Sequence, residues 1–338
     1  MRVVFPRPKL FLWKTGFRHS LCDANRRALA QKLQNPIYKC RMDCYNIPSR
    51  LTKKGRIVMH SSVIMRFPGG KSKAFTMSYD DGVEQDIRLI ELMQKQGVKG
   101  TFNLNSDCFA APGTTYPAGQ VHRRMTQEQC LALYQREGVE VAGHATGHGF
   151  LQLLPQPAAI LQIVEDRKNL EHMMGKIIRG FAYPYGTFND TVVESLRACG
   201  VAYARTTLST HKFDMPTDWL RLNPTCHHND ERLFELTDQF LNESPRREPW
   251  LFYLWGHAYE FEGRDNWNLI EEFLPRIGGH EDVWYATNIE IYEYARAFDS
   301  LVFSADSALV TNPSAQDVYV LIDEKPVCIP AGCVNMQI

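Results

Sequence analysis

The sequence predicts an α/β fold, in the form of a distorted barrel of about seven strand–helix units. From residue 74 onward, short apolar stretches alternate with segments of ten to eighteen residues that have helical spacing. These helical segments commonly end at a glycine, which is a frequent helix terminator. Such alternation implies parallel strands joined by right-handed crossovers, in an open doubly wound sheet or a closed barrel. We count seven units, which favours barrel-like closure.

The first unit shows how the elements are assigned. In the segment 83–96, Ile87, Ile90 and Met93 give an apolar face at helical spacing, and Gly97 ends the helix. The expected strands are 74–78, 99–104, 139–143, 178–182, 201–205, 250–256 and 283–286. The expected helices are 83–96, 126–137, 157–174, 189–199, 230–243, 266–277 and 288–299.

Changes in this pattern divide the chain into three parts. Residues 65–300 carry the predicted barrel. The alternation then stops, and short apolar stretches separated by turns predict a small antiparallel β appendage over residues 301–338, with a packing role. Residues 1–64 show no sustained periodicity and many basic side chains, which predicts a disordered basic arm.

The formal net charge of zero conceals the composition of this arm. Residues 1–65 carry fourteen Lys/Arg against two Asp/Glu (+12), so residues 66–338 carry 24 against 36 (−12). Either translation starts at Met59 or Met65, or the arm attracts phosphate groups without specificity. We favour the first explanation, and we expect neither nucleic acid nor a membrane as a partner.

Cellular location is predicted from apolar runs and cysteine usage. No apolar run has the length of a secretory h-region or of a membrane span of about eighteen residues. The nine cysteines are odd in number and scattered, which fits free thiols in a reducing compartment. We therefore expect a cytoplasmic protein. The sequence leaves its oligomeric state open.

Polar side chains that could carry chemistry follow the ends of the expected strands. In parallel α/β folds the loops after the strands converge on one face, where reactive groups gather. The candidates are Asp80 and Asp81 after the first strand, His144 and His148 after the third, Tyr185 after the fourth, Arg205 at the end of the fifth and His257 after the sixth. Scattered surface residues would not show this placement.

This combination of residue types predicts a hydrolytic metal site. One carboxylate and two neutral imidazoles leave a divalent cation one position for water, and a second carboxylate can take the proton of that water. Asp80 and Asp81 point to opposite sides of an extended strand, which suits this division. An ordinary turn is the alternative for Asp80–Gly82, and a capped strand end is the alternative for His257. Imidazole titrates near neutral pH, so His257 is the candidate general acid.

These residues resemble the motifs of the polysaccharide deacetylases of carbohydrate esterase family four, which share the NodB-homology fold. The resemblance covers roughly residues 65–300, with the motifs in the same order. The motifs are Ser78–Gly82, His144–His148, Pro184–Gly186, Asp218–Trp219 and Leu254–His257. The resemblance implies a distorted (β/α)7 barrel that holds a divalent metal, usually zinc. By it, Asp81, His144 and His148 bind the metal, and Asp80 is the general base.

The resemblance also implies roles for three further residues. The backbone N–H of Tyr185 would stabilise the oxyanion, and His257 would protonate the departing amine. Asp218 would tune His257, with Asp214 as the alternative.

One departure from the family pattern concerns the partner of the base. The third motif normally has Arg two residues before its Pro-Tyr-Gly, where this chain has Ala182. Arg179 lies three residues upstream of that position, an odd offset that turns its side chain to the opposite face of a strand. We therefore predict that Arg205, at the end of the neighbouring strand, orients Asp80 instead.

Two further groups of residues have two interpretations each. Cys226–His228, in the long connection 206–229, could line the site or add a ligand, although an ordinary loop is the commoner use. Trp255, Tyr259 and Trp267 could stack on sugar rings, although aromatic residues in strands and helices more often belong to the core.

The predicted function is metal-dependent hydrolysis of an N-acetyl, or less often O-acetyl, group on a sugar or glycan. The main alternative is an allantoinase-like hydrolase of the same superfamily, acting on a small cyclic amide or ureide. A protein that binds glycan without turnover is the third reading. The presence of both carboxylates and all three histidines argues against it.

Overall fold

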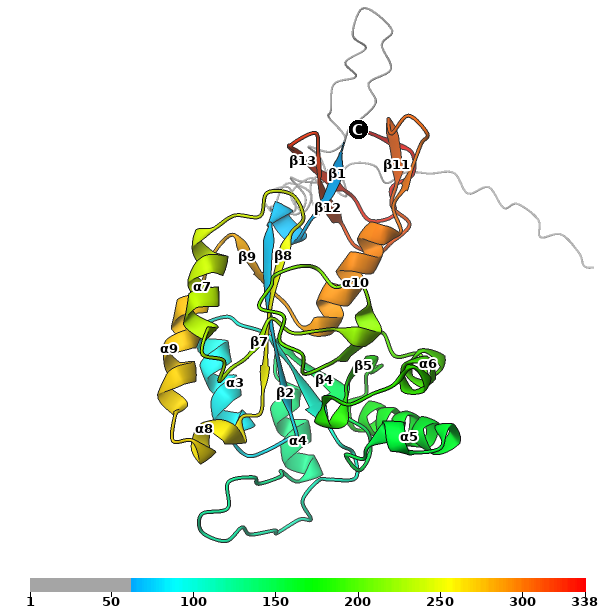
Figure 1. Ribbon diagram of the computed structural model, residues 1–338. Helices are drawn as coiled ribbons and strands as arrows, with labels where there is room; N and C mark the ends of the chain where they lie inside the picture. Colours follow the sequence, from blue (N-terminus) through cyan, green and yellow to red (C-terminus); the bar gives the residue numbers. More distant parts are fainter. Residues whose placement is uncertain (1–61) are drawn as a thin grey trace, which may run out of the picture. The chain divides into compact units, whose positions relative to one another are not determined.

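A parallel β-sheet forms the centre of the fold (Figure 1). The computed structural model describes residues 62–338, so residues 1–61 of the arm predicted over residues 1–64 lie outside the described residues. The strands lie in the order β6-β5-β4-β3-β2-β8-β7 and pair in parallel. They are β2 (Lys73–Asp80), β3 (Gly100–Leu104), β4 (Val139–Gly143), β5 (Gly180–Ala182), β6 (Tyr203–Arg205), β7 (Cys226–His227) and β8 (Trp250–Gly256). The predicted α/β class is confirmed.

The segment 222–227 connects the two outer strands of this order, so the sheet curls toward a barrel. The backbone N–H of Leu222 donates to the carbonyl of Ala204 in β6, and the N–H of Thr206 donates to the carbonyl of Leu222, both at 2.9 Å. The same segment then pairs with β8 as β7. A seventh barrel strand therefore exists, but it comes from the connection 206–229, where the sequence analysis expected no strand.

Strand β9 (Val283–Tyr285) does not take the seventh place that the sequence analysis gave to residues 283–286. It pairs with residues 73–75 in the first half of β2, whereas β3 pairs with residues 77–80 in the second half. The strand expected over residues 283–286 is therefore present, but it pairs with β2 and not with β8, because β7 already occupies the outer edge of β8.

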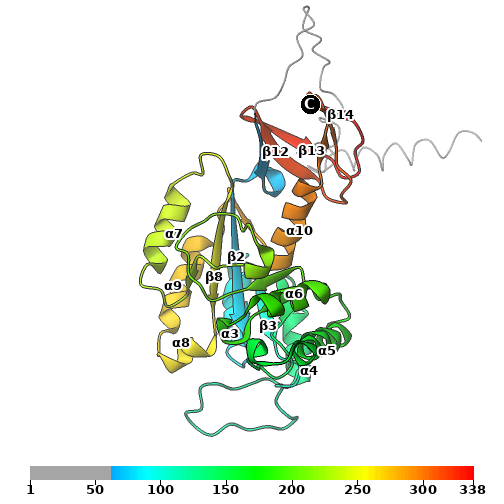
Figure 2. The same cartoon turned by 45° about the vertical axis from the view of Figure 1, so that its right-hand side comes forward.

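In Figure 1, α7 and α9 lie to the left of the sheet and α5 and α6 to its right. Helices α3, α5, α7 and α9 all bury side chains in one common core against the curled sheet (Figure 2). The helices are α3 (Asp86–Lys95), α4 (Gln127–Tyr134), α5 (Gln156–Met174), α6 (Asp190–Ala198), α7 (Leu233–Asn242), α8 (Tyr259–Gly263), α9 (Trp267–Ile277) and α10 (Asn288–Asp299). The short α8, directly after β8, was not predicted. No helix within residues 62–338 is long and apolar enough to cross a membrane.

Burial of apolar side chains between the helices and the sheet holds this arrangement together. Helix α3 buries Leu89, Ile90 and Met93 in the main core. Each such side chain contributes roughly 2 kcal/mol through removal from water. Ile87, which the sequence analysis placed on the same apolar face, is exposed instead.

Two small antiparallel sheets lie at the end of the barrel where its strands begin (Figures 1 and 2). One contains β10 (Val302–Phe303), β11 (Leu309–Thr311) and β14 (Met336–Gln337), and the other contains β1 (Val63–Arg66), β12 (Val318–Ile322) and β13 (Lys325–Ile329). Tyr294 of α10 donates its hydroxyl to the carbonyl of Arg66 at 2.6 Å and accepts the N–H of Tyr319 at 2.9 Å. Val63 and Ile64, which the sequence analysis assigned to the arm, belong to β1.

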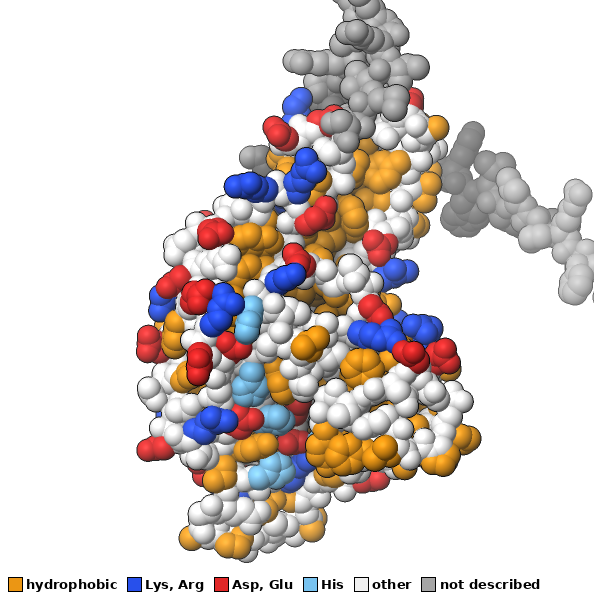
Figure 3. All heavy atoms as spheres, in the orientation of Figure 1, with side chains coloured by type: hydrophobic (Ala, Val, Ile, Leu, Met, Phe, Trp, Pro, Cys, Tyr) orange, Lys and Arg blue, Asp and Glu red, His pale blue; other side chains and the backbone are white. Residues whose placement is uncertain are grey.

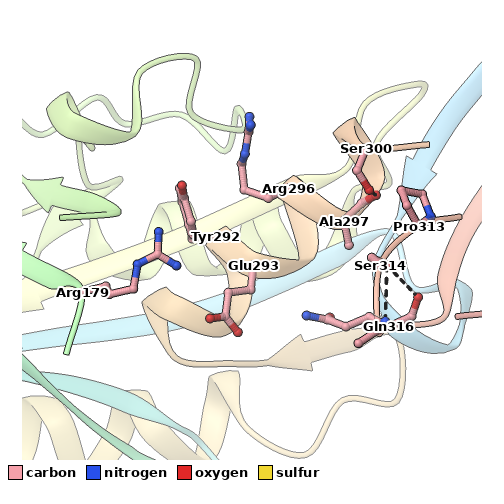
Figure 4. A pocket seen from close by; sticks show the side chains of 10 residues that line it. Arg179, Tyr292, Glu293, Arg296, Ala297, Ser300, Pro313, Ser314 and Gln316 are labelled. Atoms are coloured by element: carbon pink, nitrogen blue, oxygen red, sulfur yellow. Dashed lines mark hydrogen bonds between the residues drawn. The ribbon is translucent and has the colours of Figure 1, made fainter. Parts of the chain in front are cut away.

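A pocket of about 490 Å³ lies between α10 and the segment 313–316 (Figure 4). Arg179 enters it next to β5, with its guanidinium over the ring of Tyr292 at 5.6 Å. None of the residues that follow the barrel strands lines this pocket, so it is separate from the candidate site.

Candidate active site

The predicted site residues gather where the barrel strands end. Asp80 is the last residue of β2 and Arg205 is the last residue of β6, while His144 and His257 directly follow β4 and β8. Figure 3 shows histidine side chains together with acidic side chains on one face of the molecule, bordered by hydrophobic side chains.

Asp81, His144 and His148 form a cluster that fits a divalent metal ion. Their candidate ligand atoms lie within 4.8 Å of one another. The backbone has a positive φ at Asp81 (86°) and at His148 (55°), and these local turns direct side chains from two separate loops to one point. The three predicted ligands therefore meet in space. One carboxylate and two imidazoles are a donor set typical of an open zinc site.

The tautomer of His144 leaves one ring nitrogen free to bind a metal. Its Nδ1 donates to the carbonyl of Ala182 at 2.8 Å, so the lone pair lies on Nε2. Burial lowers the pKa of His144 to about 4 and also lowers the pKa of His148. Both imidazoles are therefore neutral at neutral pH, which is the form that binds a metal.

Two side chains of the connection between β3 and α4, drawn in teal at the bottom of Figure 1, hold Asp81. Arg124 donates to its Oδ1 at 2.8 Å, and Nε2 of His122 lies 3.2 Å from its Oδ2. Burial would raise the pKa of Asp81, but the contact with His122 and the charge of Arg124 lower it well below its usual range. The sequence analysis missed both residues, because the only signal was a short basic run in a long connection without periodicity.

Asp80 is buried beside this cluster and is held on both oxygens. Asn103, its neighbour in β3, donates to Oδ1 at 2.7 Å, and Arg205 donates to Oδ2 at 2.5 Å. Burial would raise the pKa of Asp80, but the charges of Arg205, then of His144 and His257, lower it. The carboxylate is therefore ionised and has a fixed orientation, as a general base requires.

The Arg205 side chain is fully buried and reaches Asp80 of the interior strand β2 from β6, at the edge of the sheet. Its guanidinium also lies over the ring of Trp255 at 4.6 Å, which fixes the plane of the charged group. The Trp255 ring is therefore buried against Arg205 and is not an exposed ring on which a sugar could stack. Arg179 lies away from the site, over Tyr292.

His257 lies on the other side of Asp80. Its Nε2 is 3.6 Å from Asp80 Oδ2, and its Nδ1 is 2.8 Å from Glu260 Oε1. Burial would lower the pKa of His257, but the hydrogen bond with Glu260 and the charge of Asp80 raise it. The imidazole therefore keeps its proton to higher pH than an ordinary histidine. The sequence analysis missed Glu260, although an acidic residue three positions after His257 was visible.

Asp218 is not brought to His257, which corrects the role that the resemblance implied for it. Its carboxylate accepts the backbone N–H of Leu220 at 3.0 Å and pairs with Arg221 at 2.5 Å. It therefore caps the short helix Trp219–Arg221. Asp214 lines the same surface pocket as Asp218 and not the metal cluster.

Tyr185 borders the metal cluster through its ring. Its φ of 57° belongs to the tight turn Pro184–Gly186. The ring meets that of His148 edge-on with centroids 4.4 Å apart, and stacks on Phe150 at 4.0 Å with an interplanar angle of 11°. Phe150 and Tyr185 are 43% and 54% exposed, so two stacked rings are presented to solvent beside a metal ligand.

Comparison with known proteins agrees with the motifs. The family model described as polysaccharide deacetylase matches residues 68–204, which hold the first three motifs. This match confirms the resemblance of residues 68–204 to the polysaccharide deacetylase family. Arg205 and His257 lie outside the matched region. No match was found among curated proteins.

Several solved structures are similar at low identity. A Streptococcus pyogenes deacetylase in complex with acetate is 18% identical, with a TM-score of 0.38 over 43% of this chain and 61% of that chain. A Streptomyces lividans family 4 carbohydrate esterase in complex with acetate is 15% identical, with a TM-score of 0.38 over 61% and 86%. A Bacillus subtilis peptidoglycan deacetylase is 17% identical, with a TM-score of 0.42 over 68% and 94%. The chain thus spans less than two thirds of the streptococcal protein.

Proposed function

We propose that this protein is a metal-dependent hydrolase that removes acetyl groups from the amide nitrogen of an acetylated sugar or glycan. The observation that carries the proposal is the position of an ionised Asp80 between the Asp81–His144–His148 cluster and His257. Hydrolysis of an amide needs both a base for water and an acid for the amine. This site has one candidate for each, Asp80 next to the metal cluster and His257 next to Asp80.

Asp81, His144 and His148 would hold the cation, and zinc fits this donor set best. When bound, zinc supplies a Lewis acid that polarises a carbonyl group and makes water more acidic. Asp80 takes a proton from the attacking water, and Arg205 and Asn103 keep its carboxylate in place.

His257 and Tyr185 complete the reaction. Cleavage of the C–N bond needs a proton on the departing nitrogen, and His257 gives it from Nε2. The backbone N–H of Tyr185 donates to the oxygen of the acetyl carbonyl as negative charge develops on it. The products are acetate and a free amine, so one water is consumed for each acetyl group removed.

The exposed rings of Phe150 and Tyr185 favour a sugar over a small cyclic amide. A flat apolar platform suits the apolar face of a pyranose, and it lies directly beside His148. A cytoplasmic location stays a prediction.

The proposal is tested by measuring acetate release from N-acetylated chito-oligosaccharides by the zinc-loaded protein, beside ring opening of allantoin. We expect acetate release that is lost in Asp80→Asn while bound zinc is kept. Ring opening of allantoin without acetate release would instead support the cyclic amide hydrolase. Bound zinc without turnover of either substrate would argue for a non-catalytic glycan binder.

A further inference from the structure

Glu260, in the first turn of α8, lies at the centre of a second group of polar side chains next to the proposed acid. Its Oε1 is 2.8 Å from His257 Nδ1. Its Oε2 accepts the side-chain N–H of Asn229 at 2.8 Å and faces Nε2 of His227 and His228 at 3.5 and 3.4 Å. Four nitrogen groups therefore surround one carboxylate.

The backbone and side chains at the ends of β7 and β8 hold this group of residues in place. A Cβ at Gly256 would lie 2.0 Å from the ring of His228, so only glycine leaves room for that imidazole against β8. Asn266 donates to the side-chain oxygen of Asn229 at 2.9 Å, which directs the amide of Asn229 toward Glu260. The carboxylate is thereby held from several elements.

A second metal site is the first reading that this group suggests, because His227, His257 and Glu260 offer ligand atoms within 4.8 Å of one another. The tautomer of His227 argues against it. The backbone N–H of Asn229 donates to Nδ1 of His227 at 3.1 Å, so the proton of the neutral ring is on Nε2, the nitrogen that faces Glu260. A metal would need that nitrogen without its proton. His144 has the opposite arrangement, with Nδ1 donating and Nε2 bare.

The same reasoning fixes how His257 is oriented. A carboxylate only accepts hydrogen bonds, so the short contact with Glu260 places a proton on His257 Nδ1. The other nitrogen, Nε2, then faces Asp80 Oδ2 at 3.6 Å. The groups that face the His257 ring are Asp80 from β2, Glu260 and Tyr259 from α8, and His227 from β7.

We propose that Glu260 is the positioning residue of His257, and that the imidazoles of His227 and His228, with Asn229, keep its carboxylate ionised. Glu260 accepts the Nδ1 proton and so directs the Nε2 proton of His257 toward the leaving nitrogen. It performs from α8 the role that the sequence analysis gave to Asp218. This inference rests on the proposed function, because it names the partner of the acid in that reaction.

Substrates with different leaving groups distinguish the positioning of His257 by Glu260 from a purely structural role of Glu260. An amine leaves only with a proton, whereas p-nitrophenolate leaves without one, so only the first reaction needs the acid. We would compare kcat and KM of wild type, Glu260→Gln and Glu260→Asp on an N-acetylated chito-oligosaccharide and on p-nitrophenyl acetate. The matched control is Glu271→Gln. It removes an exposed carboxylate of α9, the helix after α8, that pairs with Arg88 of α3.

We expect Glu260→Gln to lower kcat on the amide by about 100-fold, with little change in KM and with turnover of the aryl ester kept. Glu260→Asp should recover part of the loss, and Glu271→Gln should match wild type. An equal loss on both substrates, or full amide turnover in Glu260→Gln, would overturn the proposal. Loss of a second equivalent of zinc in that variant would also overturn it, in favour of a second metal site.

Nitrogen-15 NMR of the histidine rings detects the hydrogen bond between His257 and Glu260 independently of enzyme turnover. Wild type should show His257 protonated at Nδ1, and Glu260→Gln should change that signal. If wild type turned over no acetylated substrate, the proposed function would fail while this spectrum still decided the role of Glu260. A His257 ring that carries no Nδ1 proton would contradict the proposal.

Discussion

Arg205 at the end of β6 donates to Asp80 at the end of β2, although 125 residues separate them in the chain. The family position for such an arginine holds Ala182, and the curled sheet lets a neighbouring strand supply the guanidinium instead. A buried carboxylate without this partner would lose both its orientation and part of its stabilisation as an anion.

Arg205→Ala should therefore lower kcat by about 100-fold, since the base loses its fixed position. Arg179→Ala is the matched control, because Arg179 lies nearer in sequence to the family position but packs on Tyr292. Steady-state kinetics with equal zinc content in both variants is the measurement. Full turnover by a folded Arg205→Ala protein would mean that Asp80 does not depend on it.

The alkaline limb of the pH–rate profile should come from His257. Burial lowers the pKa of its imidazole, but the contact with Glu260 and the charges of Asp80 and Asp81 raise it above the ordinary value of about 6.5. The acid form is thus present at neutral pH and is lost as pH rises through the raised pKa. The profile of kcat/KM on an acetylated sugar should fall at alkaline pH in wild type. His257→Gln should lower the plateau and remove that limb, and an unchanged limb would assign it to another group.

Asp86 should make stability depend on pH in the direction opposite to an ordinary aspartate. Burial raises its pKa to about 8, and its Oδ2 accepts the hydroxyl of Tyr134 at 2.6 Å. A folded-state pKa above the unfolded value gives stability that is present below about pH 4 and is lost as pH rises toward about 8.

Wild type should therefore lose several kcal/mol of unfolding free energy, relative to Asp86→Asn, between about pH 4 and pH 8. Urea unfolding of the two proteins at pH 5 and pH 8 measures this difference. The same pH dependence in both proteins would show that Asp86 does not titrate in this range.

Phe150→Ala should weaken binding of long substrates without slowing the chemical step. A sugar ring that packs on Phe150 would contribute about 1 kcal/mol to binding, so KM for an N-acetylated oligosaccharide should rise roughly 5-fold with kcat unchanged. We choose Phe150 because Tyr185 has a positive φ, and replacing it would disturb the backbone N–H. A monosaccharide substrate is the control and should show no change in KM. A fall in kcat on both substrates would mean that Phe150 supports His148 instead.

Much of the barrel could be predicted because its strands and helices have strong periodicity and glycine ends. The seventh strand could not, since Cys226–His227 is only two residues long and lies in a connection without regular pattern. The pairing of β9 with β2 could not be predicted for the same reason, because β7 was not recognised as the strand beside β8. Pairing partners depend on which edge is already occupied, and that information is not local in the sequence.

The site shows the same limit. The cluster of Asp81, His144 and His148 could be predicted because each residue follows a strand, and the ends of parallel strands converge. Glu260 and Arg124 could not, because their partners are set by the path of a short helix and of a long connection. Asp218 was misplaced because its motif is short and Arg221, three residues on, pairs with it locally.

The zinc content of the purified chain, measured by mass spectrometry after dialysis against micromolar zinc, tests the metal site directly. We expect one zinc ion per chain in wild type and in His227→Gln, and none in the double variant His144→Ala, His148→Ala. A wild-type protein that retained no zinc, or a double variant that kept a full equivalent, would contradict the central claim that these ligands form the metal site.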